Sequence, residues 1–318
     1  MKKELGIFLI LVALCAVVSI LNPRFLSAAN LQNTARLVGM YGIFSIGVGV
    51  VIITSGIDLS IGSKMALLGV LLSMMLMQSH WPSLAAIVLT VGVAMALGLL
   101  HGTLITRMKI QPFVVTLCGL LFYRGLARFI AKDETKGFGN AEGFERLRDL
   151  ATGNLIGIPA PFVVLIVVSV VMWVVLHKSV FGRYLYAVGR NEDAARYSGI
   201  NTKLVITAAY IICALLTGVA AILFAFYTNS ISPSTHGSFY ELYGIAAAVL
   251  GGCSLRGGEG SVLGILVGTA LLQVLQNLVN LLGVDPSLNF AVMGAVILIG
   301  VMADQVLKQR AAKTVMAK

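Results

Sequence analysis

Long apolar stretches follow one another along the whole chain, separated by short polar turns. A helix needs about 20 apolar residues to cross a bilayer, and most of these stretches approach that length. Apolar windows between loop signals predict ten segments, at residues 5–21, 37–55, 65–79, 83–105, 112–131, 159–177, 204–227, 242–255, 261–283 and 288–303. Because helices satisfy their own backbone hydrogen bonds in lipid, this pattern predicts an all-α polytopic membrane protein with about ten transmembrane helices.

The composition agrees with a membrane-embedded chain. Of the 318 residues, 58% are hydrophobic and only 11% are charged, whereas about 25% are charged in soluble domains. No polar stretch is long enough for a separate soluble core, so residues 1–318 are expected to form a single transmembrane domain surrounded by membrane lipid. The net charge of +10 falls mainly in short loops, which orient a chain in the bilayer, and nucleic acid is therefore not an expected partner.

The distribution of basic residues predicts the orientation. The first apolar run resembles a signal peptide, but the count requires that it stays as the first span. With the N-terminus in the cytoplasm, six basic residues lie outside, two lie in the fifth segment (Arg124 and Arg128), and fifteen lie inside, namely Lys2, Lys3, Lys64, Arg107, Lys109, Lys178, Arg183, Arg190, Arg196, Lys203, Arg256, Lys308, Arg310, Lys313 and Lys318. This positive-inside bias predicts that both termini are cytoplasmic.

Two of the ten segments, 65–79 and 242–255, are shorter than a full span, and each follows a polar turn that contains glycine. Short or interrupted segments in corresponding positions of two halves indicate a transporter's solute path, because irregular backbone is tolerated in a membrane only when it is buried or lines a cavity. If segments 2–5 and 7–10 are repeats, these two segments correspond, and the odd spacing makes the repeats inverted.

The first short segment follows the stretch TSGIDLSIGS, residues 54–63, which places Asp58 beside apolar spans. Burying an unpaired carboxylate costs several kcal/mol or more. We expect Asp58 to hold the turn by accepting hydrogen bonds from backbone N–H groups of the next segment, as an N-cap does. Asp58 and Ser60 are also candidates for the lining of the solute path.

The loop between the sixth and seventh segments, about residues 178–203, is the most polar cytoplasmic stretch. Within it, NEDAARYSGI predicts a short helix with Asn191 as its cap, acidic residues in its first turn and Gly199 as its stop. A capped helix too polar for the bilayer could be a docking surface or a solvated connection.

Several blocks of the sequence resemble the permeases of ABC importers of the ribose, xylose and arabinose type. In chain order these are TSGIDLSIGS, QPFVVTLCGLLFYRGLA, GRYLYAVGRNEDAARYSGI, YELYGIAAAVLGGCSLRGGEGSVLGILVGTALL and NLVNLLGV, within residues 25–304. The resemblance implies a permease subunit in a bacterial cytoplasmic membrane, with a separate ATPase subunit, an extracytoplasmic sugar-binding protein and a second permease subunit, identical or closely related, as partners. It also implies that 191–200 inserts into the ATPase, with Asn191, Glu192, Ala194, Ala195, Ser198 and Gly199 as coupling residues.

The sequence contains no G-x-x-x-x-G-K-[ST] phosphate loop, in agreement with a separate ATPase. GGCSLRGGEGS is rich in glycine but lacks the lysine, and we interpret Gly257, Gly258 and Gly260 as a tight turn. The four histidines have no metal-ligand spacing, and no cofactor is expected. The four cysteines are expected to be small buried apolar side chains without disulfides.

The other candidates for the solute path are polar or aromatic residues in the spans. Arg124 lies about 18 Å along the fifth segment by helix rise, where its guanidinium could meet sugar hydroxyls, reach the outer interface or pair with a carboxylate. The remaining candidates are Gln111, Phe113, Asn277 and Asn280, although amides inside spans serve equally well to link helices.

Two other function classes compete with an ATP-driven importer. A carrier driven by an ion gradient would be expected to keep acidic residues within its spans for proton or sodium coupling. Only Asp58 comes close to such a position. A membrane enzyme would need a catalytic constellation, and the sequence offers no such set.

Overall fold

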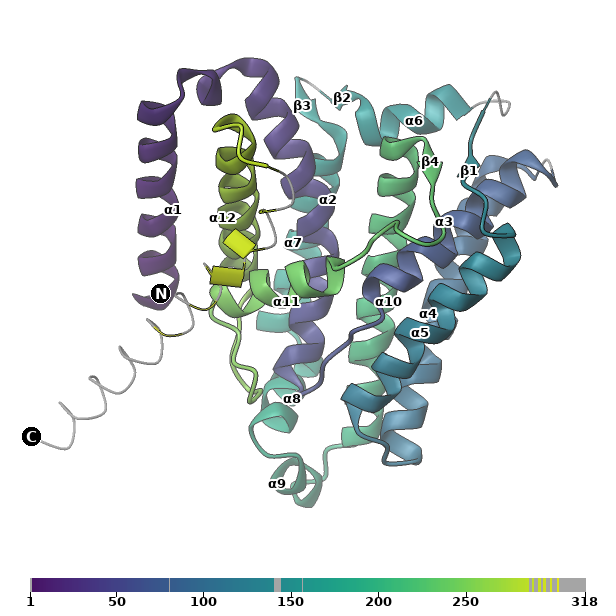
Figure 1. The fold of residues 1–318 in the computed structure, drawn as a ribbon. Helices are drawn as coiled ribbons and strands as arrows, with labels where there is room; N and C mark the ends of the chain where they lie inside the picture. The colour runs from purple at the N-terminus through teal and green to yellow at the C-terminus, as the bar shows by residue number, and fades with distance from the viewer. Residues whose placement is uncertain are drawn as a thin grey trace, which may run out of the picture.

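The computed structural model describes residues 2–79, 81–139, 144–155 and 157–285, with single positions between 288 and 302. In this part of the chain the structure is a helical bundle (Figure 1). The helices of the bundle are α1 (Lys2–Leu21), α2 (Ala28–Ile53), α3 (Ile61–Met77), α4 (Ser83–Arg107), α5 (Pro112–Ala131), α7 (Ala160–His177), α10 (Thr202–Thr228), α11 (Tyr240–Leu250) and α12 (Val262–Leu281). The short elements are η1 (Pro23–Leu26), β1 (Lys136–Gly137), α6 (Phe144–Thr152), β2 (Asn154–Leu155), β3 (Ile158–Pro159), α8 (Val180–Arg190), α9 (Glu192–Tyr197) and β4 (Ser230–Ile231).

Nine of the ten predicted segments correspond to these nine bundle helices, and most of the tenth, 288–303, lies outside the described residues. Six helices are long and apolar enough to cross a membrane, namely α2, α4, α5, α7, α10 and α12, whereas α1, α3 and α11 supply shorter apolar stretches. The protein is therefore all-α and multi-pass. Helix α2 begins nine residues before the predicted 37, because the hydroxyl of Ser27 caps it by accepting from the N–H of Asn30 (3.3 Å).

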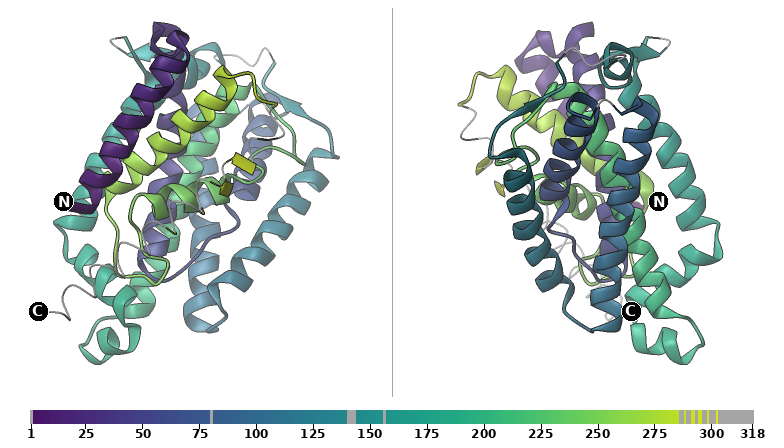
Figure 2. Two further views of the ribbon diagram at one scale, coloured as in Figure 1. Left: turned by 60° about the vertical axis from the view of Figure 1, so that its left-hand side comes forward. Right: turned by 90° about the vertical axis from the view of Figure 1, so that its right-hand side faces the viewer.

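Helices α2 and α10 form the centre of the bundle and are buried along most of their length. Helix α10 packs against α4, α2 and α3, and α2 also contacts α7, α11 and α12. Helix α5 covers α3 on one side, while α1 packs on α12 at the opposite edge, as the two views of Figure 2 show. The contact of α1 with α12 has a small apolar core of its own around Val18, Phe25 and Val274.

The two ends of the bundle differ. The end that carries α8 and α9 also holds the α4–α5 turn, and we name it the α9 end; the opposite end, named the α6 end, holds η1, α6 and the strands (Figure 1). At the α6 end, β1 pairs antiparallel with β4 (Lys136 with Ile231), and β2 pairs with β3. The predicted outer loop 132–158 thus contains a helix and three of the four strands.

Two helices of the bundle are preceded by non-helical segments that enter from opposite ends. The segment 54–60 enters from the α9 end and leads to α3, and the segment 229–239 enters from the α6 end and leads to α11 (Figure 1). Both helices therefore begin inside the bundle, where their first backbone N–H groups have no intrahelical partner. These groups determine the chemistry of the site described below.

The cysteines are free, but they do not all match the sequence-based expectation. Cys213 and Cys253 are buried, as predicted, whereas Cys15 is partly exposed and Cys118 is exposed on α5. The prediction of a buried side chain is therefore wrong for Cys118. An apolar span presents one face outward, and the sequence alone did not identify that face.

Glycine allows α4 and α10 to approach closely. A Cβ atom on Gly98 of α4 would lie 2.6 Å from the carbonyl oxygen of Tyr210 in α10, whereas one on Gly92, earlier in the same helix, would meet no atom within 4 Å. Gly98 is therefore packed tightly against α10, whereas Gly92 in the same helix has free space beside it.

We expect Gly98→Ala to destabilise the protein by about 1–3 kcal/mol, the usual cost of forcing extra atoms into a packed interface. Gly92→Ala should cause no loss, because it adds no contact and alanine favours helix. Melting temperatures of the two variants in the same detergent test this difference. Equal melting temperatures would contradict the packing of α4 on α10.

Candidate functional site

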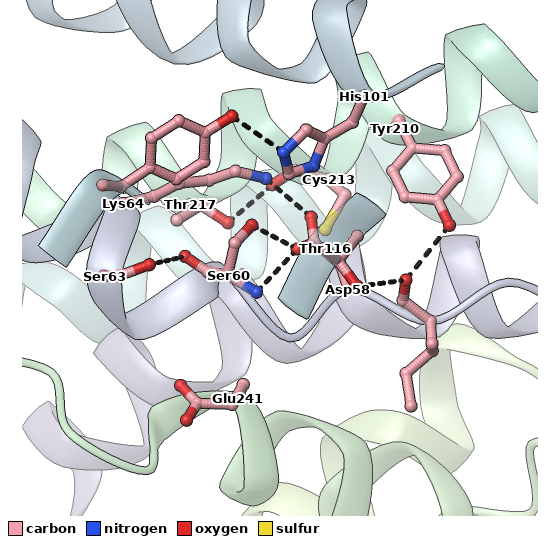
Figure 3. Close-up of polar contacts among 12 residues, drawn as sticks. Asp58, Ser60, Ser63, Lys64, His101, Thr116, Tyr210, Cys213, Thr217 and Glu241 are labelled. Carbon is pink, nitrogen blue, oxygen red and sulfur yellow. Dashed lines mark hydrogen bonds and ion pairs between the residues drawn. The ribbon is translucent and has the colours of Figure 1, made fainter. Parts of the chain in front are cut away.

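A buried ion pair holds the turn between α2 and α3. One carboxylate oxygen of Asp58, Oδ2, lies 2.6 Å from Nζ of Lys64, and both side chains are fully buried. The other oxygen, Oδ1, accepts from the backbone N–H (2.9 Å) and the hydroxyl (2.5 Å) of Ser60 (Figure 3). The Asp58 carboxylate is therefore satisfied entirely by this chain, and it anchors the start of α3.

Two sequence-based predictions about this turn need correction. Lys64 was counted among the cytoplasmic loop charges, but it lies inside α3 and is buried against Asp58, which leaves fourteen basic residues on the predicted inner side. The N-cap of α3 is Ser60, not Asp58, and Asp58 receives the N–H of that cap residue. The predicted hydrogen bonds to Asp58 from backbone N–H groups of the next segment are therefore replaced by one from Ser60, the residue just before that segment.

The backbone of the same turn is tied to two further helices. The carbonyl oxygen of Ile57 accepts from the hydroxyls of Tyr210 on α10 (3.1 Å) and Thr116 on α5 (3.3 Å). Nearby, the hydroxyl of Tyr123 and Nε2 of His101 are 2.7 Å apart, which links α5 to α4. These bonds satisfy polar groups that would otherwise be costly to bury, and they fix the turn with respect to its neighbours.

The start of α11 lies against the start of α3. The backbone N–H of Gly62 donates to Oε2 of Glu241 (3.3 Å), and a Cβ on Gly237 would lie 2.6 Å from the carbonyl oxygen of Gly62. Glu241 is buried, and Figure 3 shows it near the start of α3. The two interrupted helices thus meet through their N-termini, whose unpaired N–H groups favour a nearby carboxylate.

Sequence reasoning did not select Glu241. A signal was present, since Glu241 follows a glycine-containing turn and precedes a short apolar segment, as Asp58 does. The two carboxylates differ in one respect. Asp58 is neutralised by Lys64, whereas the Glu241 side chain accepts a hydrogen bond from the backbone N–H of Gly62.

Arg124 makes contacts that none of the sequence-based alternatives included. Its guanidinium donates to the carbonyl oxygens of Pro233 (3.1 Å) and His236 (2.8 Å), in the segment that leads to α11. Arg128, one turn later, pairs instead with Asp133 at the surface (2.6 Å). Arg124 is partly buried, so it links α5 to the second interrupted segment close to Glu241.

The structure does not bring the other path candidates to this place. Gln111 and Phe113 lie exposed at the start of α5. Asn277 on α12 exchanges amide hydrogen bonds with Asn30 on α2 (2.7 and 3.1 Å), which is the helix-linking alternative. Asn280 is exposed. No group of three or more His, Cys, Asp or Glu side chains in the described residues could hold a metal ion.

Helix α9 has the predicted local structure. The side chain of Asn191 caps it by accepting from the N–H of Ala194 (2.9 Å), and Gly199 ends it with a φ of +85°, a conformation that favours glycine. Glu192 accepts from the hydroxyl of Thr202 (3.1 Å), which ties the start of α9 to α10. The hydroxyl of Ser198 donates to the carbonyl oxygen of Ala194 (2.9 Å).

The exposed surface of α9 differs from the predicted set of coupling residues at two positions. Ala195 is buried against the rest of the chain, so its side chain anchors the helix. Tyr197, which the sequence analysis did not select, is 85% exposed. Exposed aromatic side chains are enriched at docking surfaces.

Comparisons with known proteins agree with this architecture. The family model described as "Branched-chain amino acid transport system / permease component" matches residues 30–301. The ribose import permease protein RbsC of Bacillus subtilis is 40% identical over 304 residues, covering 95% of this chain and 93% of that protein. The probable ABC transporter permease protein y4mJ of Sinorhizobium fredii is 34% identical (97% and 91% covered), and the D-allose transport system permease protein AlsC of Escherichia coli is 30% identical (96% and 92% covered).

No solved structure matches the chain. The family model and the relatives each cover most of the sequence, and they confirm the resemblance found in the sequence blocks. The relatives are transport subunits and not enzymes. The chain therefore belongs to the family of permease components of ABC importers.

Proposed function

We propose that this chain carries a monosaccharide across a bacterial cytoplasmic membrane, driven by ATP that a separate subunit hydrolyses. The observation that carries the proposal is α9, a capped and exposed helix at one end of a multi-pass bundle, in a chain 40% identical to a ribose import permease. A sugar-binding protein would deliver the solute at the α6 end. A second permease subunit, identical or closely related, would complete the path, because one docking helix serves one ATPase subunit.

We further propose ten spans with both termini in the cytoplasm, within a single domain of residues 1–318. When Lys64, which lies inside α3, and Arg36, which lies inside α2, are left out, fourteen basic residues lie inside and five outside, and this count supports the orientation. The two interrupted segments support inverted repeats, since 54–60 and 229–239 enter from opposite ends and lead to helices whose starts meet. This is the relation that a two-fold axis in the membrane plane would produce.

The solute path in this proposal runs beside the meeting point of α3 and α11. Glu241 and Arg124 are its best candidates, because both are only partly engaged with backbone groups and lie on separate helices. Asp58 fixes the start of α3 next to this region through its ion pair with Lys64 and its hydrogen bond from the hydroxyl of Ser60. An ion-coupled carrier is less well supported, since the chain belongs to the family of permease components of ABC importers.

The orientation can be tested by cysteine labelling in a variant whose exposed and partly exposed cysteines, Cys118 and Cys15, are replaced by alanine. Arg146→Cys on α6 should react with a membrane-impermeant maleimide in intact cells. Tyr197→Cys on α9 should react only after permeabilisation. Labelling of both from the same side would show that α7 does not cross the membrane, and the reverse pattern would show that the N-terminus is outside.

The docking role of α9 predicts that Tyr197→Ala weakens association with the ATPase subunit. Truncating an exposed aromatic anchor typically costs about 2 kcal/mol or more at an interface, so co-purification of the ATPase should fall by about tenfold or more. Met108→Ala is the control, because Met108 is 65% exposed at the same end, in the α4–α5 turn. Equal co-purification with both variants would remove the docking role of α9.

The ion pair predicts a specific pattern of rescue. Asp58→Asn and Lys64→Met should each destabilise the protein by about 3–5 kcal/mol, because each leaves a buried charge without its partner. The double variant, which removes both charges, should recover most of the lost stability and uptake. Membrane abundance, melting temperature and uptake report this recovery. Additive losses in the double variant would contradict a structural ion pair.

A further inference from the structure

The glycine-rich turn between α11 and α12 forms a backbone junction with two distant segments at the α9 end. The hydroxyl of Ser55, just after α2, lies 3.0 Å from the carbonyl oxygen of Gly189 and 2.9 Å from that of Arg256. The N–H of Gly258 donates to the carbonyl oxygen of Ile53 (2.9 Å). We name these contacts, from Ile53–Ser55, Gly189 and Arg256–Gly260, the glycine junction.

The glycines of the junction are needed for direct backbone contact. A Cβ on Gly189 would collide with the carbonyl oxygen of Ile53, and one on Gly257 would collide with the hydroxyl oxygen of Ser55. Gly257 also has a φ of +82°, which disfavours other residues. In the same turn, Gly252 has a similar φ of +94°, but a Cβ there would meet no atom within 4 Å. Gly257 and Gly252 therefore both need a positive φ, but only Gly257 is in close contact with another segment.

The junction connects the three segments that an importer must move together. Gly189 lies two residues before Asn191, the cap of α9. Ser55 begins the extended segment that leads to Asp58 and α3, and the Arg256–Gly260 turn joins α11 to α12. The hydroxyl of Tyr186 on α8 adds a bond to the carbonyl oxygen of Gly260 (2.8 Å). A displacement of α9 therefore reaches both interrupted helices through backbone contacts.

We propose that the glycine junction is a rigid block that moves as one body with α9 and transmits its displacement to the starts of α3 and α11. Ser55, Gly189 and Gly257 are the positioning residues of this block. The inference rests on the proposed function, since it assumes that an ATPase subunit moves α9. Contiguous packed elements of this kind are the physical route by which coupling travels between distant sites.

The test uses the assembled transporter in proteoliposomes and measures both ATP hydrolysis and solute uptake. Gly257→Ala should raise the ATP hydrolysed per solute by about tenfold, within the usual range of coupling between sites, while ATP hydrolysis itself continues. Gly252→Ala, the matched control, should keep the wild-type ratio. Ser55→Ala removes the shared hydroxyl without adding volume, and it should raise the ratio in the same direction even if Gly257→Ala fails to fold.

A wild-type ratio in both Gly257→Ala and Ser55→Ala would overturn the proposal. If the wild-type transporter itself shows no ATP-dependent uptake, the proposed function fails instead, and the two failures are distinguishable. Rigidity is tested by spin labels on Tyr184→Cys of α8 and Leu255→Cys of the turn, which are 42% and 58% exposed. Their distance distribution should be the same in the nucleotide-free and ATP-bound transporter, and a shift between the two states would show that the junction opens.

Discussion

The structure depends on the requirement that every backbone polar group in a membrane finds a partner inside the protein. Two helices begin within the bundle and need partners for their first N–H groups. At the start of α11 the N–H groups of Tyr240 and Leu242 donate to the carbonyl oxygens of Gly237 and Phe239, whereas at the start of α3 two carboxylates are the acceptors. Asp58 receives the N–H and hydroxyl of Ser60 at the start of α3. Glu241, from the start of α11, receives the N–H of Gly62. The bond from Gly62 to Glu241 holds the two interrupted helices against each other, and the bonds to Asp58 fix the start of α3.

The carboxylates of Asp58 and Glu241 differ in how their charge is balanced. Lys64 neutralises Asp58 within the first turn of α3, so this pair contributes position and no net charge. In the part of the chain that the structure describes, Glu241 has no such ion pair, and Arg124 binds the segment just before it through carbonyl oxygens. In the proposed solute path, this carboxylate and guanidinium, each partly used by backbone groups, would exchange those bonds for the hydroxyl groups of the solute. Conformational change at this place would therefore rearrange hydrogen bonds without exposing an unpaired charge.

Much of the fold could be predicted from the sequence, because the length of an apolar run directly reflects bilayer thickness. The cap and stop of α9 were also predictable, since Asn191 and Gly199 act through local backbone geometry. The pairing of Lys64 with Asp58 was not predicted. A lysine at the edge of an apolar run is normally assigned to a loop, and only the folded turn shows that Lys64 is buried in α3. Glu241 and Tyr197 were missed because their roles depend on contacts or exposure set by distant segments. The role of Asn277 was undecided for the same reason, because an amide can line a path or link helices, and only the structure shows its bond with Asn30.

The central claim is that ATP drives the solute through this chain and that no ion gradient does. The most direct measurement reconstitutes the chain with its ATPase subunit and sugar-binding protein in proteoliposomes, supplies ATP to the ATPase, and collapses proton and sodium gradients with ionophores. The account predicts that uptake of radiolabelled monosaccharide continues unchanged without gradients and stops when ATP is replaced by a non-hydrolysable analogue. Uptake that stops with the gradients and persists without ATP hydrolysis would contradict it.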